Sequence, residues 1–353
     1  MNLVRLIPRS RSKDPAGRGK AVVLLDFLSL RGRGDDRAAT ANGEEPAVSR
    51  PTIGLALGGG AARGFAHIGA IRALVARGLK PDVIVGTSMG AVVGGCYAAG
   101  HLDAFEAWAC ALNARNVLGY VDISLSGSGM IDGRRLATRL EETVGDLGIE
   151  QLPVRFAAIA AEVGTGHEIW LTRGRLSEAL RASYALPGLF APVRVGGRWL
   201  MDGVVVNPVP VAAARALGAR VVIAVNLNAD MFGLGTTIAD HGSDHEDAER
   251  LDESSRRRGL RGLFGSEQTF RRQVLGTAGR PGIATVMMDA FNVMQDRITR
   301  SRLAGDPPDV LISPRLGHVG LFEFHRAQEA IALGSEATEK ALEPVAEAIA
   351  ALT

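Results

Sequence analysis

The amino-acid sequence predicts an α/β fold in which helices cover both faces of a parallel sheet. Three times along the chain an apolar strand pattern leads through a loop into a helical pattern, starting at residues 52, 81 and 197. These strands are apolar runs without polar alternation, which is typical of parallel strands buried on both sides. The chain has 353 residues, of which 46% are hydrophobic, so it can form a large core.

The elements of these three units can be assigned from their patterns. Strands are expected at residues 52–57, 82–85, 197–201 and 221–227. Helices are expected at residues 62–77, from the GTSMG turn to residue 100, and at residues 210–217. The first helix carries apolar residues at spacings of three and four, and Gly78 is placed to end it.

The remaining elements lie between and after these units. Residues 129–145 have the pattern of an amphipathic helix, and residues 153–163 and 166–172 that of a strand hairpin. A helical pattern from residue 176 stops at Pro187. Towards the C-terminus we expect a long helix at residues 282–304, a strand at 308–314, and one or two helices from residue 323.

Composition divides the chain into four parts. Residues 1–50 are rich in Arg, Gly, Ser and Asp and predict a flexible leader, with a short helix or strand at 21–29. Residues 51–229 hold the three units and predict the main domain. Residues 230–280 are acidic and then basic, and predict a poorly ordered excursion. Residues 281–353 return to a helix–strand–helix pattern and are expected to complete the domain.

Composition also limits the classes of function. A net charge of +2 gives no reason to expect nucleic-acid binding. The two cysteines, Cys96 and Cys110, are expected to be free thiols in a reducing compartment. No apolar run reaches the ~18 residues of a membrane span, and residues 22–30 are too short and too polar at Asp26 for a signal peptide. We therefore expect a cytoplasmic protein.

A candidate nucleophile lies in the segment GTSMG. Ser88 follows an apolar strand and precedes a helix rich in small residues. A tight turn there strains the serine and brings its flanks close together, which suits Gly86 and Gly90 two residues before and after it. The turn places the hydroxyl beside a helix N-terminus, which favours the negative charge formed during attack. The alternative is an ordinary glycine-rich turn.

A nucleophilic serine needs a base, and no histidine is placed by a clear motif. His67 precedes the serine on the first helix, and of the six histidines after it, His318 and His325 remain open. Asp202 is another candidate, because it follows an apolar strand and burial beside Ser88 would raise its pKa. Taken alone, Asp202 is better explained by a common Asp-Gly turn.

The glycine-rich segment LGGGAARG is suited to a third role. An acyl-transfer site needs backbone N–H groups directed at the oxyanion, and the loop formed by Gly58, Gly59, Gly60 and Ala61 offers them. The segment lacks the Lys-Ser/Thr of a P-loop and the spacing of a dinucleotide fingerprint. Arg63, one residue before Gly64, would brace this loop, meet a lipid phosphate or pair with a carboxylate.

Four segments in this order resemble the patatin-like phospholipase family, especially its bacterial members. They are LGGGAARGFAHIGAI, VGTSMGAVVGG, RASYALPGLFAPV and LMDGVVVNPVPVAAARALGA, within residues 53–228. The resemblance implies a three-layer α/β/α sandwich with a largely parallel central sheet, and a Ser–Asp dyad without histidine. It implies Ser88 as nucleophile, Asp202 as base and residues 58–61 as oxyanion loop.

The resemblance further implies a serine acyl hydrolase that needs no metal or cofactor. Its expected substrates are phospholipids, lysophospholipids or other fatty-acyl esters. A peripheral membrane contact is then expected, and residues 256–272, where arginines alternate with Leu and Phe, are either that contact or a solvated linker.

Two departures from the family pattern bear on activity. One extra residue precedes Gly64 in the glycine motif, and Val204 follows Asp202-Gly203 where the family carries a smaller residue. Val204 and the long leader at residues 1–50 support the alternative of a catalytically weak lipid-binding or regulatory protein that keeps the fold.

Overall fold

The computed structural model describes residues 50–113, 134–231, 276–277 and 280–353. These residues belong to one unit, Val48–Thr353. The predicted leader, with its element at 21–29, and almost all of the predicted excursion, with the patch at 256–272, lie outside the described residues. The boundaries of the four predicted parts stay predictions.

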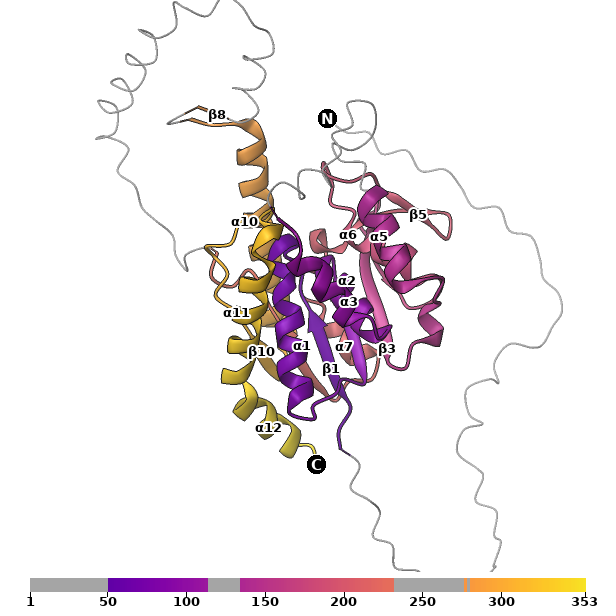
Figure 1. The fold of residues 1–353 in the computed structure, drawn as a ribbon, viewed down its shortest axis with the longest axis vertical. Helices are drawn as coiled ribbons and strands as arrows, with labels where there is room; N and C mark the ends of the chain where they lie inside the picture. The colour runs from indigo at the N-terminus through magenta and orange to yellow at the C-terminus, as the bar shows by residue number, and fades with distance from the viewer. Residues whose placement is uncertain (1–49, 114–133, 232–275, 278–279) are drawn as a thin grey trace, which may run out of the picture. The chain divides into compact units, whose positions relative to one another are not determined.

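A sheet forms the centre of the unit (Figure 1). It has eight strands in the order β10–β7–β1–β2–β3–β6–β5, with β4 also paired to β3. Five neighbouring strands are parallel, namely β1 (Ile53–Leu57), β2 (Val83–Thr87), β3 (Arg155–Glu162), β7 (Val221–Val225) and β10 (Val310–Ile312). The antiparallel pairs are those of β4 (Glu168–Leu171) with β3, β6 (Arg198–Asp202) with β3, and β5 (Val193–Val195) with β6. The sheet is mixed because short turns join β3 to β4 and β5 to β6, where parallel pairing would need a long crossover.

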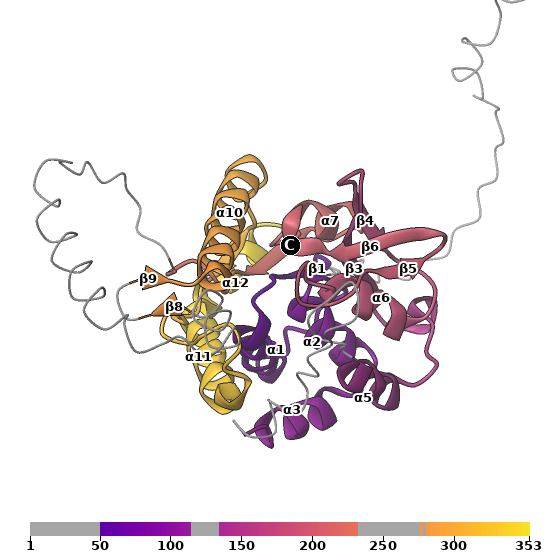
Figure 2. The ribbon, with the colours of Figure 1, turned by 90° about the horizontal axis from the view of Figure 1, so that it is seen from above.

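Helices form a layer on each side of the sheet (Figure 2). One layer contains α1 (Ala66–Ala76), α2 (Met89–Ala98), α3 (Leu102–Cys110), α5 (Arg134–Val144), α6 (Leu176–Tyr184) and α11 (Ala327–Lys340). The other contains α7 (Val211–Ala216) and α10 (Ile283–Gly305). The predicted three-layer sandwich is therefore confirmed.

Two hydrophobic cores correspond to these two layers. Successive side chains of a strand point to opposite faces, so Leu55 and Leu57 enter one core while Ala56 enters the other. The central strands β1, β2 and β7 are buried along their whole length. This double burial explains why their sequences are apolar without alternation.

Three local features differ from the sequence prediction. The first predicted helix begins as a 3-10 turn, η1 (Ala61–Phe65), before α1 takes over, and Gly78 ends it at φ 76° as expected. Helix α3 and strand β5 have no counterpart among the expected elements. β5 is a short edge strand with the sequence Val-Arg-Val and no fully buried residue, so it lacks the apolar run that marks the other strands.

The C-terminal helices attach to the first helix of the sandwich. α1 and α11 lie side by side (Figures 1 and 2), and a Cβ at Gly334 would clash with the carbonyl of Ala66. After α11 the chain ends in α12 (Leu342–Ala350), whose Val345 enters the same core. This packing brings the loop before α11 next to the glycine loop.

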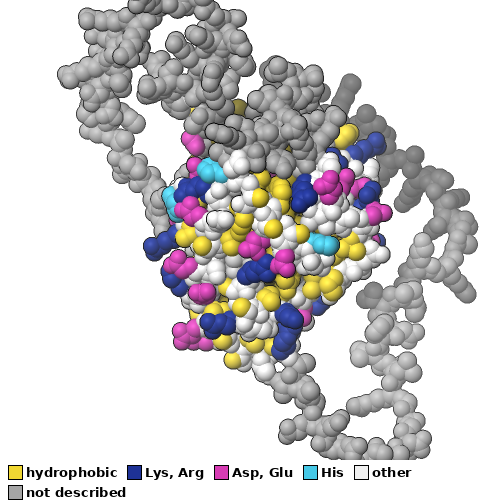
Figure 3. Space-filling model, in the orientation of Figure 1, with side chains coloured by type: hydrophobic (Ala, Val, Ile, Leu, Met, Phe, Trp, Pro, Cys, Tyr) yellow, Lys and Arg dark blue, Asp and Glu magenta, His cyan; other side chains and the backbone are white. Residues whose placement is uncertain are grey.

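The surface is mixed in charge. On the face seen in Figure 3, basic and acidic side chains are interspersed and form no single charged patch. In the described part of the chain, no helix combines the length and apolar character that a membrane crossing requires.

Candidate active site

Strand β3 brings Ser88 and Asp202 together. Its neighbouring residues Ile159 and Ala160 pair with Thr87, the last residue of β2, and with Asp202, the last residue of β6. At both positions β4 occupies the other edge of β3. β2 and β6 therefore share one edge of β3. Because one strand is parallel and the other antiparallel to β3, their carboxyl ends meet there.

Ser88 occupies a strained turn between β2 and α2. Its backbone has φ 56° and ψ −124°, a region that side-chain-bearing residues rarely adopt. A Cβ at Gly90 would clash with the carbonyl oxygen of Leu57, and one at Gly86 would clash with the first turn of α2. The two glycines therefore allow the close approach that the turn requires.

A short hydrogen bond joins Ser88 to Asp202. Ser88 Oγ donates to Asp202 Oδ2 at 2.6 Å, and the N–H of Val204 donates to Asp202 Oδ1 at 2.9 Å. Asp202 is 1% exposed. Burial raises the pKa of Asp202 to about 7, against the opposing effect of these two hydrogen bonds. The carboxylate can therefore exchange a proton near neutral pH.

Ser183 of α6 holds the strained turn through hydrogen bonds. Its Oγ accepts from the N–H of Ser88 at 2.9 Å and donates to the carbonyl of Ile159 at 2.6 Å. Sequence reasoning missed this residue, because a serine inside a helix gives no local sign of a partner 95 residues away.

The glycine loop, residues 58–61, connects β1 to η1 beside Ser88. The N–H of Gly58 donates to the carbonyl of Val225, and that of Gly59 to the carbonyl of Pro208, each at 3.0 Å. The described residues provide no hydrogen-bond acceptor for the N–H groups of Gly60 and Ala61. Of the four predicted donors, two are thus engaged within the protein.

Strain is concentrated at this site. Within the described residues, Ser88 and Ala61 are the two non-glycine residues with positive φ, at 56° and 47°. Such conformations persist only where the surrounding contacts hold them. They mark the elbow and the end of the glycine loop as two parts of one constrained arrangement.

Small residues let the loop and the elbow touch. A Cβ at Gly59 would clash with Val204 and reach within 3.4 Å of the Cβ of Ser88. A Cβ at Gly64 would clash with Met89, the first residue of α2. Val204 is buried beside Gly59, and Asp202 nevertheless stays within hydrogen-bond distance of Ser88.

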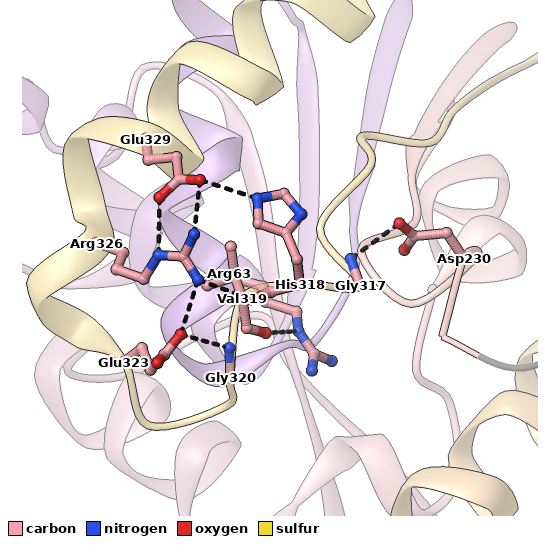
Figure 4. A network of polar contacts seen from close by, with 9 residues as sticks. All are labelled: Arg63, Asp230, Gly317, His318, Val319, Gly320, Glu323, Arg326 and Glu329. Atoms are coloured by element: carbon pink, nitrogen blue, oxygen red, sulfur yellow. Dashed lines mark hydrogen bonds and ion pairs between the residues drawn. The ribbon is translucent and has the colours of Figure 1, made fainter.

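Arg63 ties the glycine loop to the C-terminal part of the chain. Its Nε donates to the carbonyl of Val319 at 2.7 Å (Figure 4). Its Nη1 donates to Asn228 Oδ1 at 3.0 Å. Asn228 Nδ2 in turn donates to the carbonyl of Gly59 at 3.2 Å. Burial lowers the pKa of Arg63, and the charge of Asp230 acts in the opposite direction. Among the three roles considered for Arg63, these contacts favour bracing.

The histidines that the structure describes do not contact the dyad. Among the described histidines none hydrogen-bonds to Ser88 or Asp202. His318 is exposed and its Nε2 lies 2.9 Å from Glu329 (Figure 4), while the buried His67 contacts the carbonyl of Gly58. Two further histidines, at positions 241 and 245, lie outside the described residues.

Comparison with known proteins identifies the family. A family model described as patatin-like phospholipase matches residues 55–215. An uncharacterized NTE family protein of Mycobacterium tuberculosis is 36% identical over 332 residues, covering 84% of this chain and 92% of that protein. The chain belongs to the patatin-like phospholipase family. The resemblance of the four sequence motifs is thus confirmed.

Two more distant comparisons are with a protein that matches only part of this chain and with a solved structure of low similarity. The lysophospholipase nte1 of Emericella nidulans is 31% identical over 180 residues, which cover 50% of this chain and 12% of that protein. The crystal structure of VipD from Legionella pneumophila aligns over 83% of this chain and 67% of that chain, with a TM-score of 0.41 and 13% identity.

Proposed function

We propose that this patatin-like protein is a serine acyl hydrolase that cleaves fatty-acyl esters, with phospholipids and lysophospholipids as the expected substrates. The observation that carries the proposal is the 2.6 Å hydrogen bond between Ser88 Oγ and Asp202 Oδ2. It joins a hydroxyl on a strained turn to a buried carboxylate whose pKa burial raises to about 7. Family membership and the lysophospholipase relative support a lipid ester.

In the proposed reaction Ser88 is the nucleophile and Asp202 the base. Ser88 Oγ forms a bond to the ester carbonyl carbon while its proton passes to Asp202. The carbon–oxygen bond to the alcohol then breaks, and the alcohol leaves with that proton. Water then attacks the acyl carbon while Asp202 takes one of its protons. The bond between that carbon and Ser88 Oγ breaks, the fatty acid leaves, and Asp202 returns the proton to Ser88 Oγ.

We further propose that the N–H groups of Gly60 and Ala61 hold the oxyanion. The N–H groups of Gly58 and Gly59 donate to backbone carbonyls, and that of Ser88 donates to Ser183, so these three are already engaged. Two adjacent N–H groups next to the nucleophile suit an oxyanion, because preorganised donors need no rearrangement during attack. The N-terminus of α2 adds a favourable dipole there.

A chromogenic short-chain ester tests the proposal directly. Wild-type protein should hydrolyse p-nitrophenyl butyrate with a rate that rises with pH through about 7, where Asp202 loses its proton. Ser88→Ala and Asp202→Asn should each abolish turnover, whereas Ser301→Ala, at an exposed serine of α10, should not. Turnover that survives both dyad substitutions would disprove the assignment.

Covalent labelling and a lipid profile then separate the proposal from its alternative. A fluorophosphonate probe should label Ser88 in the wild type and fail to label Ser88→Ala. A folded protein that binds lipid vesicles but neither labels nor hydrolyses would instead be the weakly catalytic lipid-binding protein that Val204 suggests. Analysis of products from mixed phospholipids, lysophospholipids and neutral esters would give the substrate class.

A lipid substrate also leads us to propose a peripheral contact with a membrane or micelle. The predicted patch at residues 256–272 precedes α10, on which several large apolar side chains are exposed: Ile283, Val286, Met287, Val293 and Met294. An apolar helix face of this kind can enter a lipid interface. Deleting residues 250–280 should reduce co-sedimentation with anionic vesicles, and unchanged binding would remove that patch from the proposal.

A further inference from the structure

His67 lies behind the glycine loop and has no role in the reaction as described so far. It belongs to α1, its side chain is fully buried, and its Nε2 lies 2.7 Å from the carbonyl oxygen of Gly58. A carbonyl oxygen can only accept, so Nε2 carries the proton and donates. Nδ1 is buried and has no hydrogen-bond partner in the described part of the chain.

The hydrogen bond of His67 fixes the peptide at which the loop leaves the sheet. The N–H of Gly58 donates to Val225, so this residue is held on both its polar groups. A peptide unit is planar and trans, so fixing the carbonyl of Gly58 also fixes the direction of the next N–H, that of Gly59. That N–H donates to Pro208. The bond of His67 therefore sets the direction of the chain as it enters Gly60.

This loop needs restraint from outside. Three consecutive glycines have more backbone freedom than any other residues, and the loop ends at Ala61, whose positive φ of 47° is unfavourable for a residue with a Cβ. Hydrogen bonds to residues outside the loop must therefore hold it. His67 supplies the one that acts on the carbonyl of Gly58.

The protonation of the ring suits this task. Burial lowers the pKa of His67 to about 4, so the imidazole is neutral near pH 7 and holds its single proton at Nε2. The unpartnered Nδ1 carries a desolvation cost that an apolar side chain would avoid. A polar side chain at this buried place is therefore explained by the Nε2 bond.

We propose that His67 is a positioning residue: its Nε2–H bond to Gly58 holds the glycine loop in the conformation that presents the N–H groups of Gly60 and Ala61 to the oxyanion. This inference rests on the proposed acyl hydrolysis. It assigns His67 no proton transfer and no contact with the substrate.

Three substitutions of His67 separate positioning from packing. Gln places its amide nitrogen where Nε2 lies and can donate to Gly58, whereas Asn places it near Nδ1 and Leu has no donor. We expect His67→Leu and His67→Asn to lower the rate of fluorophosphonate labelling at Ser88, and kcat for p-nitrophenyl butyrate, by about 10- to 100-fold with little change in KM, somewhat less than direct loss of an oxyanion donor. His67→Gln should stay within about threefold of the wild type, because the donor is kept.

Each outcome decides between the alternatives. Folded Leu and Asn variants, checked by thermal unfolding, that label at the wild-type rate would overturn the proposal. Equal losses in Gln, Asn and Leu would also overturn it, because packing alone would then explain the effect. If wild-type Ser88 itself does not label, the proposed function fails, and that failure is distinguishable because no variant is needed to see it.

A spectroscopic arm tests the hydrogen bond without activity. In the Ser88→Ala protein, long-range proton–nitrogen NMR spectra should show His67 as the Nε2–H tautomer at pH 7, with Nδ1 unprotonated. An Nδ1–H tautomer or an imidazolium at that pH would overturn the assignment even if all substitutions at His67 failed to fold.

Discussion

The serine elbow and the glycine loop lie against each other, yet they are held in different ways. The glycines that permit the elbow lie within its own motif, two positions before and after Ser88, and the distant Ser183 adds one hydrogen bond. The loop at residues 58–61 is held by groups far along the chain, including the carbonyls of Pro208 and Val225 and the side chain of Asn228. A short motif thus reveals the elbow because the glycines that it requires are close in sequence, whereas the partners that hold the loop are spread along the chain.

The largest expected effect comes from breaking the elbow locally. Gly90→Ala places a methyl group against the carbonyl of Leu57, and neither backbone can give way without moving β1 or α2. We expect a loss of about 3 kcal/mol in the free energy of unfolding and no labelling of Ser88. Urea unfolding and probe labelling measure these two quantities.

Gly100→Ala is the matched control for that change. Gly100 follows α2 with φ 78°, but an added Cβ meets no atom within 4 Å. The cost should be only about 1 kcal/mol from backbone strain, with labelling retained. If both substitutions changed the free energy of unfolding and the labelling of Ser88 equally, the close approach of Gly90 to Leu57 would not explain the elbow conformation.

The next largest effect is on the free energy of unfolding when the carboxylate of Asp202 is replaced. The pKa of Asp202 is raised by burial from 3.8 to about 7, so between these values the folded state binds a proton that the unfolded state has lost. The stability that this proton contributes is complete below about pH 4 and is lost as pH rises through 7. Asp202→Asn should therefore be more stable than the wild type at pH 8, by a few kcal/mol, and much less so at pH 5.

Urea unfolding of both proteins at the two pH values measures this difference. If the difference in the free energy of unfolding between the two proteins were the same at both pH values, the unfavourable burial of the Asp202 carboxylate would be compensated elsewhere. The same variant is expected to be inactive, so a gain in stability would be accompanied by a loss of turnover, as is common at catalytic sites.

The sequence predicted the locally determined features well. The α/β class, the order of the main elements and the family followed from apolar strand runs, helical spacing and four motifs, and these predictions are confirmed. Ser88 was a candidate from its turn between an apolar strand and a helix, whereas Asp202 was named as its partner only because the family resemblance implied it. Their meeting on one edge of β3 required the sheet register, which no local pattern contains.

The sequence could not predict contacts between distant segments. It offered four loop residues as oxyanion donors, and only the acceptors at Pro208 and Val225 reduce that choice to Gly60 and Ala61. The hydrogen bonds of Ser183 and His67 were missed for the same reason, because each joins a helix side chain to a backbone group of another segment. The roles of these residues in a reaction stay predictions.

A moderate loss of kcat is expected when Arg63 no longer links the glycine loop to Val319 and Asn228. Arg63→Lys keeps the charge but cannot reach both Val319 and Asn228 with fixed geometry. We expect kcat to fall by about tenfold on p-nitrophenyl butyrate and on a phospholipid alike. A loss confined to the phospholipid would instead favour the alternative in which Arg63 meets a lipid phosphate. Arg198→Lys, at an exposed ion pair with Glu162, is the control and should change neither rate.

The smallest expected effect is that of substituting His318. It tests whether the glycine loop depends on the backbone next to Arg63 or also on nearby side chains. Arg63 is held by the carbonyl of Val319, while the side chain of the preceding His318 points to Glu329 in an exposed cluster (Figure 4). His318→Gln should therefore leave kcat and probe labelling unchanged within about twofold, because an exposed pair of this kind contributes little. If it lowered kcat as Arg63→Lys does, the cluster around Glu329 would belong to the support of the glycine loop. The loop would then depend on side chains at the start of α11 as well as on the backbone beside them.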